Sequence, residues 1–235
     1  MVRFILIGFF VAISSLLSAQ VVLEEGKVLY DITYDSLSPS LKSNMGYLAK
    51  DAAMYFKGSK SRTEMGVGPF GKNVTINDQQ AKTLTILLNV FNKKMAMVKT
   101  DSEMVAFKSM MIKDSLPTEV IVTGETKKIL GYLCKKAIIK RYPIGQKVNI
   151  SEVWFTQQIR PFYVDPDPAF KKLDGLLMDF RINQDGNIVH IKAKLVMPAP
   201  IDDSIFVVPK DYQFVTEAEL TRIMNVLMME RQNGN

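Results

Sequence analysis

The sequence predicts an α+β protein built on one large curled antiparallel sheet, an unclosed half-barrel with helices covering its concave face. Strand-like segments recur from residue 28 to residue 208 without a Gly/Ser-rich linker or a shift in composition. Only three segments show helical spacing of apolar residues. A sheet of about ten strands must close, fold into a sandwich or curl around a helix. With 47% apolar and 23% charged residues, the chain can bury a substantial core.

The first 19 residues have the pattern of a secretory signal peptide. Arg3 precedes an apolar run over residues 4–17, and Ser18 and Ala19 supply small side chains before Gln20. The run is short for a bilayer core of about 30 Å, and no cysteine follows that could carry a lipid anchor. We therefore expect cleavage after Ala19, a single domain over residues 20–235, and a soluble periplasmic or secreted protein. An uncleaved membrane anchor is the alternative.

Alternating apolar and polar residues predict the strands. Val28, Tyr30, Ile32 and Tyr34 share one parity, which is typical of a half-buried strand. The loop at residues 184–187, with its Asp-Gly pair, predicts an antiparallel hairpin. The further strands are expected at residues 53–58, 60–65, 73–77, 82–88, 94–99, 119–123, 130–141, 147–156, 176–183 and 188–197.

Three segments are expected to form helices. Ser38 and Pro39 begin the first, and Thr216 with Glu219 forms a capping-box pattern before the C-terminal one. The middle helix, at residues 102–113, carries the methionines Met104, Met110 and Met111 on one face. We expect this helix to fill the hollow of the sheet as a movable plug; the alternative is an ordinary amphipathic helix packed outside the sheet.

Five segments occur in an order that resembles a known family. They are YFKGSKSRTE at 55–64, TGETKKILGYLCKKA at 123–137, VWFT at 153–156, LDGLL at 173–177 and FVVPKDY at 206–212. Together they resemble secreted, uncharacterised bacterial proteins of the GLPGLI type and their close relatives. That resemblance implies a distant similarity to the fold of the lipoprotein carriers LolA and LolB, an unclosed antiparallel barrel. It transfers no catalytic residues, because fold does not imply function.

The composition excludes several kinds of chemistry. One cysteine and one histidine supply neither an intramolecular disulfide nor a Cys/His zinc site. His190 shares strand parity with Lys192 and Lys194, so it is expected to face solvent, and no Gly-x-Ser-x-Gly motif accompanies it. Carboxylate pairs drawn from Asp165, Asp167, Asp174, Asp202 and Asp203 remain as an alternative acid and base. We expect no enzyme, no cofactor and no metal, and the scattered net charge of +6 predicts no nucleic-acid partner.

Methionine is the most suggestive residue type for function. Unbranched thioether side chains adapt to irregular apolar partners, although they also fill ordinary cores. We expect a non-enzymatic binding or carrier protein for a lipid or acyl chain, possible partners being a lipoprotein acyl chain or an envelope protein. The alternative is an envelope interaction module with a self-filled core; an apolar cavity of about 300 Å³ or more favours the carrier. The expected cavity lining is Met54, Phe56, Ile86, Met95, Met97, Trp154, Met178 and Phe180.

Overall fold

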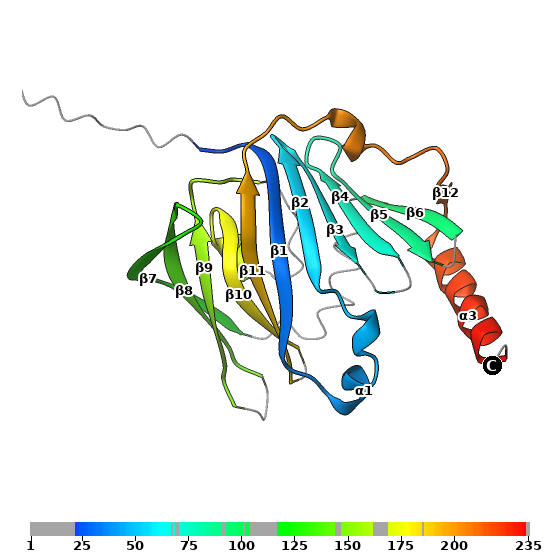
Figure 1. Ribbon diagram of the computed structural model, residues 1–235, viewed down its shortest axis with the longest axis horizontal. Helices are drawn as coiled ribbons and strands as arrows, with labels where there is room; N and C mark the ends of the chain where they lie inside the picture. Colours follow the sequence, from blue (N-terminus) through cyan, green and yellow to red (C-terminus); the bar gives the residue numbers. More distant parts are fainter. Residues whose placement is uncertain are drawn as a thin grey trace, which may run out of the picture.

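The computed structural model describes residues 22–66, 68, 71–90, 93–100, 102–103, 117–143, 147–161, 169–184 and 186–233. In this part of the chain the strands form one 12-stranded sheet, antiparallel except at one edge (Figure 1). The strands are β1 (Glu25–Ser36), β2 (Asp51–Lys57), β3 (Lys60–Gly66), β4 (Lys72–Asp78), β5 (Thr83–Val90), β6 (Lys93–Thr100), β7 (Thr118–Ile129), β8 (Tyr132–Arg141), β9 (Asn149–Thr156), β10 (Leu176–Gln184), β11 (Asn187–Met197) and β12 (Gln213–Phe214). The expected large, unclosed and mostly antiparallel sheet is confirmed.

Two series of neighbouring strands make up the sheet. The order is β12-β6-β5-β4-β3-β2-β1-β11-β10-β9-β8-β7, so that β1 to β6 extend to one side and β11 to β7 extend to the other. The series meet where β1 pairs with β11. The short strand β12 pairs in parallel with β6 at one edge, and β7 lies at the other. The expected hairpin between β10 and β11 is confirmed, with Gln184 paired to Asn187.

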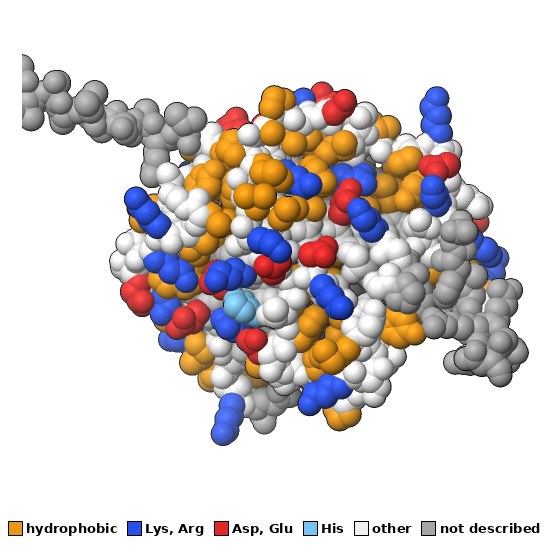
Figure 2. Space-filling model, viewed as in Figure 1, with side chains coloured by type: hydrophobic (Ala, Val, Ile, Leu, Met, Phe, Trp, Pro, Cys, Tyr) orange, Lys and Arg blue, Asp and Glu red, His pale blue; other side chains and the backbone are white. Residues whose placement is uncertain are grey.

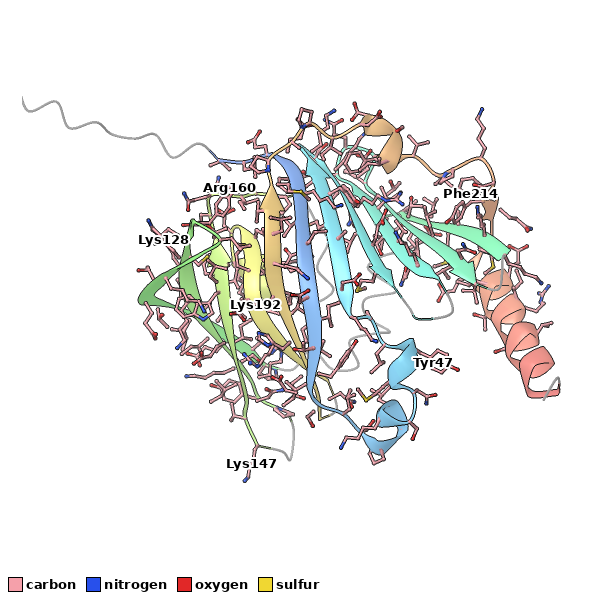
Figure 3. The ribbon with its side chains drawn as sticks, viewed as in Figure 1. Tyr47, Lys128, Lys147, Arg160, Lys192 and Phe214 are labelled. Atoms are coloured by element: carbon pink, nitrogen blue, oxygen red, sulfur yellow. The ribbon has the colours of Figure 1, made fainter. Side chains whose placement is uncertain are left out.

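The strand register divides the side chains between an inner and an outer face. Residues paired across an antiparallel ladder point to the same side, and we call the side of Val28, Tyr30 and Ile32 the inner face. Figure 2 shows the outer face, where side chains of both charges gather around His190, the pale blue residue. Lys192 of β11 lies on the same outer face (Figure 3). The expected exposed face for His190, Lys192 and Lys194 therefore agrees with the register.

Two clusters make up most of the core. One cluster joins β1, β2 and β11 to Cys134, Ile159 and Met178, and a second packs Phe155 and Phe180 against the 3₁₀ helix η3 (Phe170–Lys172). The rings of Phe170 and Phe180 meet edge to face, with their centroids 5.5 Å apart. Apolar burial of this kind is the main favourable contribution to folding.

A third cluster lies on the outer face. Val74, Ile76, Leu87 and Ala96 pack beneath residues 203–212, a segment that begins with the 3₁₀ helix η4 (Asp203–Phe206). We call residues 201–212 the strap. Arg62 Nη1 donates to the carbonyl oxygen of Ile205 at 2.8 Å, which ties the strap to β3. Lys57 on β2 also binds the strap, through the carbonyl oxygen of Ile201 and the carboxylate of Asp203.

The helices whose bounds lie within the described residues are few. They are α1 (Pro39–Lys42), the 3₁₀ helix η1 (Met45–Tyr47) and α3 (Glu217–Asn233), in addition to η3 and η4. Thr216 and Glu219 form the expected capping box before α3, since Thr216 N donates to Glu219 Oε2 at 2.8 Å and Glu219 N to Thr216 Oγ1 at 3.3 Å. Among the described residues no helix is both long and apolar enough to cross a membrane.

The expectation that helices cover the concave face is not met by the helices that the structure describes. Helix α3 runs away from the sheet beyond β6 and β12, and α1 lies at one end of the sheet (Figure 1). The expected plug at residues 102–113 lies, apart from Ser102 and Glu103, outside the described residues, as does the signal segment at residues 1–19. Amphipathic spacing indicates that a helix has an apolar face, but it does not indicate which surface that face covers.

One turn also differs from expectation. Leu130 was expected to begin a strand, but Leu130 and Gly131 form the two-residue turn between β7 and β8, with φ of 51° and 86°. Positive φ at both central positions is the geometry of a tight hairpin turn, in which glycine is favoured and leucine is unusual. The apolar character of Leu130 therefore gave a misleading strand signal.

The position of Phe56 gives a prediction for stability. Its ring is fully buried on the inner face of β2, so we expect Phe56→Ala to lower the free energy of unfolding by about 3 to 5 kcal/mol. Val207→Ala is the control, because that side chain is 63% exposed and should change stability by about 0.5 kcal/mol or less. Urea titration measures both, and equal losses in the two variants would contradict this account of the core.

A candidate ligand pocket at the end of the inner face

An apolar pocket lies where the inner face ends near α1. Its volume is about 470 Å³. The floor is a row of inner-face side chains that the register aligns, in which Tyr34 of β1 pairs with Val189 of β11 and Val189 pairs with Ile182 of β10. The roof comes from the segment between β1 and β2, and Tyr47 of η1 in that segment is labelled in Figure 3. The lining is Tyr34, Leu37, Leu41, Leu48, Ile182, Asn187 and Val189.

Two hydrogen bonds hold the roof over the floor. The hydroxyl of Tyr34 donates to the carbonyl oxygen of Ala49 at 2.7 Å, and the backbone N–H of Ser38 donates to Asn187 Oδ1 at 2.7 Å. Burial raises the pKa of Tyr34 above its usual value, so the hydroxyl keeps its proton and remains a donor. The polar atoms at the pocket therefore serve to position its walls.

The local sequence explains this geometry. Pro39 fixes the first turn of α1, whose helix ends after only four residues, and a second short turn follows at η1. Leu41, Met45 and Leu48 have helical spacing in the sequence, yet Leu41 and Leu48 lie on the side of the pocket whereas Met45 is 55% exposed. Helical spacing therefore identified two of the three apolar residues correctly and misplaced the third because the helix is interrupted.

The side chains that line the pocket are suited to binding an apolar group and include no acid or base catalyst. Its lining holds five aliphatic side chains, one tyrosine and one asparagine, and none of these is a general acid or base near neutral pH. Within the described residues, no group of three or more His, Cys, Asp or Glu side chains could hold a metal ion. What the arrangement can do is remove the apolar part of a ligand from water.

Seven of the eight side chains expected to line a cavity do lie on the inner face. Register places Met54, Ile86 and Met97 in one row, and the others are Phe56, Met95, Met178 and Phe180. Phe56 and Met178 are fully buried within the first core cluster, and Phe180 belongs to the second. None of the eight lines the pocket beside α1. Alternation thus indicated which side chains share a face, but it did not indicate the pocket beside α1, and the expected cavity lining stays a prediction.

Trp154 is the eighth of these residues, and the strand register places it on the other face. Trp154 pairs with Asp179 of β10 and with Lys136 of β8, which places its ring on the outer face. The ammonium of Lys127 lies 4.1 Å from the ring centroid and that of Lys136 lies 5.9 Å from it. Cation–π attraction of this kind stabilises a tryptophan at the surface. Its parity with Glu152 was the sequence signal for this outward orientation.

The pocket residues missed by sequence reasoning had a weaker signal. Ile182 and Val189 follow the alternation of their strands, and Tyr34 closes the first strand pattern. Their shared position at one end of the sheet depends on the pairing of β1 with β11, which joins segments far apart in the sequence. Alternation within single strands does not specify that pairing.

Comparison with known protein families gives one match. The family model DUF4412, described as a domain of unknown function, matches residues 40–164, which is more than half of the chain. The chain belongs to the DUF4412 family. The matched range includes Leu41 and Leu48 of the pocket roof, whereas the floor residues lie outside it. The finer resemblance to the GLPGLI type stays a prediction.

Two solved structures align with most of this chain at a low TM-score. One is LprF from Mycobacterium bovis, with 11% identity and a TM-score of 0.34, covering 80% of this chain and 90% of that one. The other is a beta-barrel-like protein of unknown function, DUF1849, from Brucella abortus, with 10% identity and a TM-score of 0.34, covering 77% of this chain and all of that one. No curated protein matches the chain.

Cysteine and histidine often act in catalysis, and this DUF4412 chain has one of each, Cys134 and His190. Cys134 is fully buried, and burial raises the pKa of its thiol to about 11. His190 Nε2 lies 2.8 Å from Asp179 Oδ1, on the outer face beside Arg181. Cys134 therefore stays a protonated thiol near neutral pH, a state that disfavours nucleophilic attack.

The raised pKa of Cys134 leads to a prediction for thiol reactivity. Iodoacetamide should alkylate Cys134 of the native protein at pH 8 at least about 100-fold more slowly than in 8 M urea, because little thiolate is present and the sulfur is covered. Mass spectrometry follows the reaction over time, and the denatured protein is the control. Rapid alkylation of the native protein would contradict the burial of Cys134.

Proposed function

We propose that this protein is a non-enzymatic binding or carrier protein for a hydrophobic or amphiphilic ligand, whose apolar chain occupies the pocket beside α1. The observation that carries the proposal is the pocket itself, of about 470 Å³ and lined mainly by Leu37, Leu41, Leu48, Ile182 and Val189. This volume falls within the usual range of about 300 to 1,000 Å³ for sites that take small ligands.

The position of the pocket supports the proposal. The pocket lies at the end of the inner face, and its roof is a short segment held by the bonds of Tyr34 to Ala49 and of Ser38 to Asn187. The same bonds keep the walls in place when the pocket is unfilled, so little ordering is needed on binding.

The lack of acid–base groups in the lining supports a non-enzymatic role. A signal peptide at residues 1–19 fits a protein that handles lipids or acyl chains outside the cytoplasm, and periplasmic or secreted localisation is part of this proposal. A lipoprotein acyl chain or an envelope protein would be its partner.

The alternative is an interaction or structural module with a self-filled core. The observation that favours it is the burial of Phe56 and Met178, which closes the part of the inner face where a larger hollow was expected. The two functions differ in what the pocket does. A carrier binds apolar chains there, whereas a structural module has no use for them.

Leu48 provides the test of ligand binding. Leu48→Gln places a polar amide in the lining, and Leu48→Trp reduces the space. Titration with cis-parinaric acid, whose fluorescence rises in apolar surroundings, measures affinity. We expect each variant to weaken binding about tenfold, because a ligand chain loses apolar contact worth about 1 to 2 kcal/mol.

Met45→Gln is the matched control, since Met45 belongs to the same segment but is exposed. It should bind the probe with the affinity of the natural chain. Circular dichroism checks that all three variants keep the sheet. Absence of binding in the natural chain, or equal affinity in folded Leu48 and Met45 variants, would favour the self-filled module.

A further inference from the structure

A stripe of polar side chains runs along the inner face of β3 and β4. The register pairs Ser61 with Asn77 and Thr63 with Thr75, and Asn73 follows toward the end of the sheet where the pocket lies. We call these five residues the polar stripe. They are flanked by apolar side chains on both sides, namely Met54 and Phe56 of β2 and Leu84, Ile86 and Leu88 of β5.

Strand β4 has the reverse of the pattern seen in most of the sheet. Its apolar residues Val74 and Ile76 point to the outer face, where the strap covers them, while its polar residues point inward. On β1 the inner-face residues are instead Val28, Tyr30 and Ile32, which are buried in the core. The polar side chains of the stripe therefore stand on the face where β1 carries apolar ones.

The stripe contains buried hydrogen-bonding groups that lack partners. Asn77 is 2% exposed, and its Nδ2 donates to Ser61 Oγ at 3.2 Å. Its Oδ1 and the Oδ1 of Asn73 are both buried, and neither accepts a hydrogen bond from the part of the chain that the structure describes. Turning the Asn77 amide over would satisfy the oxygen and leave the NH₂ group unpaired instead. Buried polar groups are nearly always paired in native proteins, so these atoms require an explanation.

The chemistry of the two oxygens indicates what would satisfy them. An amide oxygen accepts from O–H or N–H groups and repels anions. Asn73 and Asn77 are four residues apart on one strand, so their side chains are separated by about 13 Å. Thr63 and Thr75 place hydroxyl groups in the row between them. One small donor cannot reach both ends, whereas a head group with several hydroxyls can.

We infer that the polar stripe binds an uncharged, polyhydroxylated head group, of the sugar or polyol class, belonging to an amphiphile. This inference rests on the proposed function, since it assigns the polar part of a ligand whose apolar part lies in the pocket. Asn73 is the end of the stripe nearer the pocket: its row contains Tyr30 of β1, while the row of Asn77 contains Gly26. The head group donates hydrogen bonds to Oδ1 of Asn73 and Asn77.

Two detergents with the same 12-carbon chain test the inference below their micelle concentrations. Dodecyl maltoside presents many hydroxyl donors, and octaethylene glycol monododecyl ether presents ether oxygens and a single terminal hydroxyl. Isothermal titration calorimetry should show the natural chain binding the maltoside about tenfold more tightly. Asn77→Leu should weaken maltoside binding about tenfold and leave ether binding unchanged.

Asn73→Leu serves as the second variant, because Asn73 is less buried overall and its substitution disturbs the core less. Asn89→Leu, on the outer face of β5, is the matched control and should keep the preference for maltoside. Equal affinity for the two detergents in the natural chain, or an undiminished preference in both stripe variants, would overturn the inference and leave the proposed function standing. Failure of both detergents to bind the natural chain would overturn both.

Discussion

The pairing of β1 with β11 is the constraint on which the rest of the structure depends. Each series of strands is built from neighbours in sequence, but only this ladder joins the two series into one sheet. Its register places Tyr34 beside Val189 and Ile32 beside Ile191, so that the apolar sides of both series become one inner face. A shift by one residue would point one series the wrong way. The core clusters and the pocket floor therefore both follow from this ladder.

Local features of the fold could be predicted from sequence because their causes are local. Ten of the eleven longer strands were expected within a few residues of their bounds, and the capping box of α3 lies where Thr216 and Glu219 predicted it. The main exception is β7, which extends well past residue 123 to Ile129 through a bulge between Val122 and Thr126. Three residues of β7 stand opposite one residue of β8 at this bulge, an irregularity that the sequence of a single strand does not reveal.

The candidate site was less accessible from sequence. Methionine content drew the expected cavity toward Met54, Met97 and Met178, and in the structure Phe56 and Met178 are fully buried in the first core cluster. A pocket that alternation did not indicate lies beside α1, where long-range pairing and two hydrogen bonds position Leu41 and Leu48. Likewise, the inward orientation of Asn73 and Asn77 follows from the strap, because Val74 and Ile76 face the strap on the outer side. None of these relationships is local in sequence.

The seam between β1 and β11 also has a consequence for the order of folding. Hairpins of adjacent strands close short loops and can form early, but Val28 and Val196 are paired across nearly the whole chain. Closing so long a loop costs entropy before its contacts repay it, and such pairings fold slowly. Strand β1 cannot complete its pairing in the sheet until β11 has formed. Until β1 pairs with β11, the apolar side chains of β1 remain exposed to solvent. A newly made chain would therefore stay incompletely folded for longer than its many local hairpins suggest.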